Sequence, residues 1–195
     1  MNILFLDTDP RMCAYAHCDE HVIDMIPIYT KLLSTVHHVL DPQGKIVPHL
    51  DEVDPDYYGV ETGGLMGELI NIPYTAAWIK SYDANYMWMH DLWFWMHKEY
   101  WYRYDKMHED WTNLYNKLSH TPENIIKGEL TSPLQPTPEK FPFRKVHGLE
   151  DEFQNTIESY RSYYKNWVKE NDAKWGGIVE NMRTPPSWIL ENANI

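Results

Sequence analysis

Between residues 85 and 111, apolar and aromatic side chains recur every three or four positions, and the stretch contains neither Gly nor Pro. That period is typical of one face of an α-helix. The face consists of Tyr86, Met89, Trp93, Met96, Tyr100, Arg103 or Tyr104, Met107 and Trp111. At about 1.5 Å per residue, the helix would be roughly 40 Å long. We therefore expect it to be the central helix, with the other elements packed around it.

A second, more polar stripe lies on the same predicted helix and consists of His90, Phe94, His97, Trp101, Tyr104 or Asp105, and His108. Glu99 and Arg103 are four residues apart, a spacing at which a Glu that precedes a cation is favourable. Two interpretations are open. Either the aromatic side chains are core and the pair is an intrahelical salt bridge, or the helix is a platform for stacking flat rings, with Arg103 facing a phosphate or carboxylate.

The three histidines of this stripe are not expected to share a metal ion. Their spacings of seven and eleven residues correspond to roughly 10 and 16 Å along a helix, which is too far for ligands of one ion. The chain also lacks a P-loop, GxGxxG, GxSxG, HExxH and a paired CxxC. We therefore expect no metal and no cofactor.

The N-terminal run MNILFL is a short apolar segment of extended character, followed by Asp7-Thr8-Asp9-Pro10. Thr8 or Asp9 can cap a helix that has Pro10 at its first position. The apolar positions after it indicate a helix as far as Leu40, interrupted by Pro27. Because an internal proline removes a hydrogen bond, we expect a kink or a break near Ile26.

Polar residues line one side of this predicted helix. Cys13, His17, His21 and Asp24 follow one another at steps of four, four and three. Three interpretations remain open: a half-buried polar stripe with His21 bonded to a backbone carbonyl, a non-metal site centred on the histidines, or a metal site that uses the His pair with Cys13 or Asp24 as third ligand.

Two segments are expected to be irregular. Residues 41 to 75 are rich in Asp, Pro and Gly, and residues 119 to 148 contain most of the other prolines. Residues 149 to 170 have helical spacing and predict the last long helix. After it, Pro185 and Pro186 prevent an earlier helical start, so we expect the tail to lay Trp188 and Ile189 back on the body. Together these elements predict an all-α fold in a single helical domain that spans residues 1 to 195.

Composition limits the possible partners. The chain of 195 residues has 17 basic and 29 acidic side chains and a formal charge of −12. It lacks the basic footprint that supplies most of the affinity of nucleic-acid binders, so any DNA contact must come from a local patch such as Lys98, Arg103 and Lys106. No apolar run of transmembrane length and no signal-peptide pattern is present. We expect a cytoplasmic protein with reduced Cys13 and Cys18 and no membrane partner.

Several motifs carry a resemblance to known proteins. The opening MNILFLDTDP, the run CDEHVIDM, and later EYWYRYDKMH, SYRSYYK and PPSW resemble a group of small phage-encoded proteins. That group is remotely similar to the pyrimidine-dimer DNA glycosylase (endonuclease V) family of phages. The shared skeleton is a short N-terminal segment, a helix with Asp-x-His, a long central helix with Glu and Arg, and an aromatic C-terminus. Asp19 and His21 match the first motif here, and Glu99 and Arg103 match the second.

The resemblance implies an all-α fold and a glycosylase/lyase mechanism. In that mechanism the N-terminal α-amine attacks the sugar of a damaged pyrimidine and forms an imine, while a carboxylate on the first helix assists strand scission. An α-amine has a pKa near 8, so a useful neutral fraction exists at pH 7. Here the amine would be that of Met1, because Asn2 is too bulky for ordinary Met removal.

The chain departs from the family at the catalytic carboxylate. The family's Glu lies seven residues after the His, and this position is Ile28 in the present sequence. Asp24 lies one turn earlier on the same predicted face, so we expect it to replace that carboxylate. Both lysines of the phage-group pattern are also lost, becoming Glu20 and Asp24.

The first functional hypothesis is therefore a DNA-base-processing protein with an N-terminal amine nucleophile. Its expected catalytic residues are Met1, His21, Asp24 and Glu99, and its expected substrate-binding residues are His17, Asp19, Trp101, Arg103, Tyr104 and Lys106. A second hypothesis keeps the fold and changes the ligand to a free nucleotide or nucleobase, which an acidic protein tolerates better. A third is a non-enzymatic phage protein that binds a host partner.

Overall fold

The computed structural model describes residues 3–41, 72–133, 151–178 and 182–190. Its helices are α1 (Pro10–Ala16), α2 (Asp19–Leu40), α3 (Ile72–Ser81), α4 (Asp83–Tyr104), α5 (Glu109–Leu118), α6 (Glu152–Asn171) and α7 (Ser187–Leu190). These ranges contain helices and no strands, which confirms the predicted all-α fold. No helix within them is long and apolar enough to cross a membrane.

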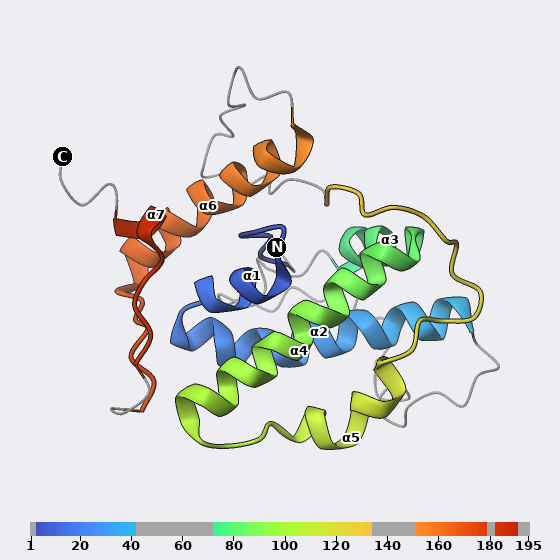
Figure 1. The fold of residues 1–195 in the computed structure, drawn as a ribbon, viewed down its shortest axis with the longest axis horizontal. Coiled ribbons are helices and arrows are strands. Elements are labelled where there is room, and N and C mark those ends of the chain that lie inside the picture. Colours follow the sequence, from blue (N-terminus) through green and yellow to red (C-terminus); the bar gives the residue numbers. More distant parts are fainter. Residues whose placement is uncertain (1–2, 42–71, 134–150, 179–181, 191–195) are drawn as a thin grey trace.

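Helix α4 lies at the centre of the arrangement, as the sequence predicts. It packs against α1, α2 and α3, and α2 also contacts α5 (Figure 1). Four side chains of the predicted apolar face, Tyr86, Met89, Trp93 and Met96, are completely buried. The N-terminal segment Ile3–Leu6 is also buried and has no regular secondary structure. Asp9 caps α1 through its side chain, with Pro10 in the first turn, as expected.

The break in the N-terminal helical region lies at His17, nine residues before the predicted position near Ile26. The chain leaves the helix at His17, and α2 then continues through Pro27 without interruption. The first amides of α2 find partners from elsewhere in the chain, since Cys18 N–H donates to the Tyr164 hydroxyl at 2.8 Å and Asp19 N–H to the Lys174 carbonyl at 2.8 Å. These contacts provide partners for the first backbone amides of α2, which have none within the helix, so a helix can start here. Pro27, in contrast, costs only a single hydrogen bond within α2.

The central helix ends at Tyr104 rather than at Trp111. Asp105 adopts a left-handed conformation with φ of 51°, and its N–H donates to the Trp101 carbonyl at 2.8 Å. A left-handed residue commonly ends a helix, and Asp tolerates that conformation better than most residues. Helix α5 begins four residues later, with His108 as its N-cap. The turn brings α5 back alongside α4, so the 16 Å separation predicted for His97 and His108 is wrong.

Asp105 provides a test of this turn. Replacement by Val is expected to lower the free energy of unfolding by about 1–2 kcal/mol, because a β-branched residue is strained at positive φ. Replacement by Gly is expected to be neutral or slightly stabilising. Chemical denaturation measures both, with Lys106→Val as the control at the next exposed position. Equal losses for the two valine variants would contradict the left-handed turn.

The C-terminal elements follow the prediction with shifted boundaries. The structure begins α6 at Glu152 rather than at residue 149, because the Asp151 side chain accepts the amides of Phe153 and Gln154. Trp188 in α7 packs against the core, with its ring 6.2 Å from that of Tyr164, as expected for the tail. Helix α3 already begins at Ile72, inside the end of the predicted irregular segment. Residues 42–71 and 134–150 lie outside the described part of the chain.

Candidate functional site

Glu99 and Arg103 form the predicted intrahelical pair, within a larger buried cluster. Arg103 donates to Glu99 Oε2 through Nε at 3.1 Å and through Nη2 at 3.0 Å. Its Nη1 donates to Asp19 Oδ1 at the start of α2, also at 3.0 Å. Arg183 of the C-terminal segment donates to the two Glu99 oxygens at 2.6 and 3.0 Å. Two arginines and two carboxylates thus balance in charge, as buried ions require.

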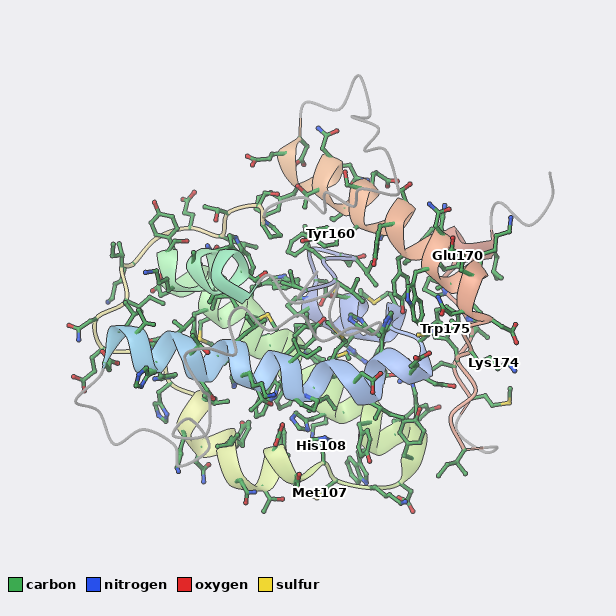
Figure 2. All side chains as sticks on the ribbon, turned by 180° about the vertical axis from the view of Figure 1, so that it is seen from behind. Met107, His108, Tyr160, Glu170, Lys174 and Trp175 are labelled. Atoms are coloured by element: carbon green, nitrogen blue, oxygen red, sulfur yellow. The ribbon has the colours of Figure 1, made fainter. Side chains whose placement is uncertain are left out.

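The cluster also fastens the C-terminal segment to the helical body. The second oxygen of Asp19 accepts the amides of Gly176 at 2.6 Å and Gly177 at 2.9 Å. The Ile178 amide donates to the Arg103 carbonyl at 2.7 Å, and Gly177 has a positive φ of 54°. Lys174 and Trp175 belong to this segment and lie beside the start of α2 (Figure 2). The Lys174 carbonyl accepts the Asp19 amide, and the Trp175 indole donates to the Ala16 carbonyl.

The predicted residues Asp19, Glu99 and Arg103 are therefore brought together, although two of them are closed to solvent. Glu99 is 1% exposed and Arg103 is completely buried. The carboxylates that Arg103 faces are internal ones. Tyr104 joins the same group, since its hydroxyl donates to the Asp19 carbonyl at 3.2 Å, and burial beside the Asp19 charge raises its pKa to about 12. Lys106 is exposed after the end of α4.

His17 and His21 are buried at the junction of α1 and α2. His17 lies with Nδ1 2.8 Å from the Cys13 carbonyl and Nε2 3.0 Å from the Tyr29 hydroxyl, so Nδ1 donates and Nε2 accepts. His21 Nδ1 is hydrogen-bonded to the Tyr164 hydroxyl at 3.1 Å, and the His21 ring lies 4.0 Å from that of Trp167. The expected carbonyl contact is thus made by His17 rather than by His21.

Burial controls the protonation of this group. It lowers the pKa of His17 to about 3 and that of His21 to about 4, so both rings are neutral at pH 7. It raises the pKa of the Cys13 thiol to about 12. Asp24 is half-buried, and desolvation raises its pKa as well. The predicted row on a single helix is divided by the break at His17, with Cys13 on α1 and His21 and Asp24 on α2.

Both cysteines are buried and free of disulfide bonds. Within the described ranges, no three His, Cys, Asp or Glu side chains are grouped so that they could hold a metal ion. The N-terminal amine of Met1 lies outside the described residues.

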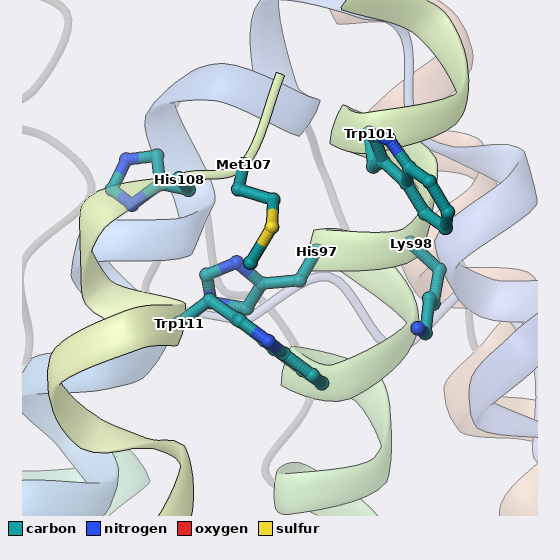
Figure 3. Close-up of a pocket in the computed structure, with 6 residues that line it drawn as sticks. All are labelled: His97, Lys98, Trp101, Met107, His108 and Trp111. Carbon is teal, nitrogen blue, oxygen red and sulfur yellow. The ribbon is translucent and has the colours of Figure 1, made fainter. Parts of the chain in front are cut away.

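A separate pocket of about 100 Å³ opens between α4 and α5 (Figure 3). It is lined by His97, Lys98, Trp101, Met107, His108 and Trp111. The turn at Asp105 creates it, because this turn places the His108 ring 5.6 Å from the His97 ring and the Trp111 ring 5.3 Å from it. Met107 is 63% exposed and extends over the His97 ring in the close-up.

The two indole walls of the pocket differ in how tightly they are packed. Trp111 is held between Trp93, at a ring distance of 5.9 Å, and Tyr115, at 4.4 Å. Trp101 on the other side is 53% exposed. The Lys98 ammonium lies over the rings of Trp101 and Trp111 at 5.5 and 5.2 Å. The pocket therefore combines aromatic surfaces with one cation.

His97 is the unusual residue of this pocket. It is 5% exposed, and neither of its ring nitrogens has a hydrogen-bond partner among the described residues. Burial, assisted by the nearby His108, lowers its pKa to about 3. A neutral imidazole carries one donor and one acceptor, and leaving both without a partner in a buried position is costly. A ligand with a polar edge that reaches one of the two nitrogens would relieve part of that cost.

The sequence predicts Trp101 as a substrate-binding residue and places it on one helical stripe with His97 and His108, but it does not assign Lys98, Met107 or Trp111 to the same pocket. Those residues come together only through the α4–α5 turn. A signal was present in the stretch Asp105 to Asp110: a helix-ending Asp, then an N-cap followed by the acidic pair Glu109 and Asp110 in the first turn of α5.

In comparisons with known proteins, no protein-family model, curated protein or solved structure matches the chain. The similarity to the phage glycosylase family thus remains a prediction from short motifs.

Proposed function

We propose that the chain binds a free nucleotide or nucleobase in the pocket between α4 and α5. The observation that carries this proposal is the His97 ring, which is buried, neutral and without a hydrogen-bond partner among the described residues, inside a pocket walled by indoles. Nucleobases present adjacent donors and acceptors on their edges. A neutral imidazole can pair with a donor or an acceptor of such an edge through one of its two ring nitrogens.

The remaining groups support the same ligand class. The open pocket of about 100 Å³ is smaller than the closed cavity of roughly 150 Å³ that holds benzene, so it would take part of one flat ring and leave the rest of the ligand outside. Stacking on aromatic side chains contributes about 1–3 kcal/mol per base. Lys98 at the rim would supply the cation for a phosphate. An overall charge of −12 fits a small ligand with one local contact better than a DNA duplex.

Titration with nucleoside monophosphates tests the proposal, with tryptophan fluorescence as the signal. We expect saturable binding, a loss of affinity of at least about fivefold in Lys98→Ala, and no change in Lys117→Ala, the control on the exposed side of α5. The corresponding nucleosides should bind wild type and Lys98→Ala equally, because they lack the phosphate. Absence of saturable binding by every nucleotide and nucleoside would contradict the proposal.

A second candidate keeps the DNA-base chemistry implied by the resemblance. It is favoured by one observation, that Asp19 meets the Glu99–Arg103 pair although Asp19 and Arg103 are 84 residues apart in the sequence. In this case a DNA strand carrying an abasic site would form an imine with the Met1 amine, and borohydride reduction would trap it as a covalent adduct. Asp24→Asn should retain the adduct and abolish strand scission. No adduct, with a known lyase as positive control, would exclude this candidate.

A further inference from the structure

The solvent face of α4 next to the pocket carries an unusual set of side chains. Phe94, Trp95, Lys98, Trp101 and Tyr102 follow at steps of one to three residues, which places them on one side of the helix. Tyr102 is 40% exposed and Trp101 is 53% exposed. Large aromatic side chains are uncommon at such exposed positions unless they serve binding.

Two arginines from other elements extend this face. The Arg11 guanidinium of α1 lies 4.8 Å from the Trp95 ring and 5.3 Å from the Tyr15 ring. The Arg183 guanidinium lies 4.0 Å from the Tyr102 ring and 4.4 Å from the same Tyr15 ring. Arg183 is already paired with Glu99. Arg11 and Lys98, in contrast, form no ion pair with any residue that the structure describes.

The charge on this face is opposite to that of the molecule. The chain has a net charge of −12, yet two cations of this face, Arg11 and Lys98, have no ion pair among the described residues and lie against partly exposed rings. Asp91 and Asp105 border the face along α4, about 21 Å apart at the helical rise. An acidic protein is expected to repel polyanions everywhere except on such a local patch.

We infer that this face binds a short single strand of nucleic acid, with one base in the His97 pocket and the neighbouring bases on the α4 aromatic side chains. A single strand alternates phosphates with flat unpaired bases, and the face alternates cations with aromatic rings. Stacking of this kind tolerates any base sequence. A duplex is a poorer ligand, because its bases are already stacked and its backbone needs a wider basic footprint. The inference rests on the proposed function, since it uses the same pocket.

Fluorescence anisotropy with labelled single strands of about eight nucleotides, within the usual site size of such proteins, tests the inference beside the mononucleotide titration. The single strand should bind at least about tenfold more tightly than a mononucleotide. Arg11→Ala and Trp95→Ala should each weaken strand binding about fivefold or more and leave mononucleotide binding unchanged. Lys98→Ala should weaken both. Met12→Ala, at an exposed position on α1, is the control.

Salt provides an independent readout. With two phosphates neutralised, the logarithm of the association constant should fall with the logarithm of salt concentration at a slope of roughly −1.4. Mononucleotide binding without tighter strand binding would overturn the inference and leave the proposed function intact. Failure of both ligands would overturn both. A dimer in light scattering that Trp95→Ala dissociates would assign the face to a second copy of the chain and would also overturn the inference.

Discussion

Replacing Arg103 by Ala is expected to lower the free energy of unfolding by about 3–5 kcal/mol, because removing one partner leaves buried charge without compensation. Arg103 is completely buried and bonds to both Glu99 and Asp19. For a chain of this length the loss corresponds to a fall in melting temperature of about 6 to 20 °C. Thermal unfolding followed by circular dichroism measures it.

Lys106→Ala is the matched control, because it removes a cation from an exposed position just beyond α4. It should change the stability by less than about 0.5 kcal/mol. Glu99→Gln should also destabilise the protein, since it removes the charge that holds both Arg103 and Arg183. A stability of Arg103→Ala within about 1 kcal/mol of wild type would contradict the structural role that we assign to the cluster.

The second large effect is a loss of stability in mild acid. Burial lowers the folded-state pKa of His17, His21 and His97 to about 3, 4 and 3, whereas the unfolded rings have the ordinary value near 6.5. The unfolded chain therefore binds protons that the folded chain excludes. Stability is fully present above pH 6.5 and falls as the pH is lowered toward the folded-state values.

As the pH is lowered from about 6 to 4.5, each of the three rings should reduce the free energy of unfolding by roughly 1.4 kcal/mol per pH unit. Urea unfolding at a series of pH values measures the slope. His21→Gln should reduce this slope by about a third, because it removes one of the three protons taken up on unfolding. His38→Gln, at an exposed position on α2, should leave the slope unchanged. A stability that is flat between pH 6.5 and 4.5 would show that these histidines are not buried in the neutral form.

The period of apolar residues was sufficient to predict α4 as the central helix and to identify its buried face. It could not locate the end of that helix, because the apolar spacing continues through Met107 and Trp111 across the left-handed Asp105. The period continues because α5, which follows the turn, also presents aromatic side chains such as Trp111 toward α4. The pocket around His97 is formed by this turn. It could not be predicted as long as residues 85 to 111 were treated as one continuous helix.

The N-terminal helices show the opposite limit. Pro27 is the strongest local signal for a break, yet the break occurs at His17, where partners far away in the sequence satisfy the backbone. The pair of Glu99 and Arg103 was predictable from its local spacing. Its contacts with Asp19 and Arg183 depend on the path of the C-terminal segment, which carries no periodic signal.

The central claim is that a ligand pairs with the buried imidazole of His97, and NMR of the ¹⁵N-labelled histidine rings observes this contact directly. On addition of a nucleoside monophosphate, the His97 nitrogen signals should shift to a saturable limit. Those of His17 should stay in place, because both of its nitrogens are already bonded inside the protein. Unchanged His97 signals at a nucleotide concentration that saturates the fluorescence signal would contradict the account.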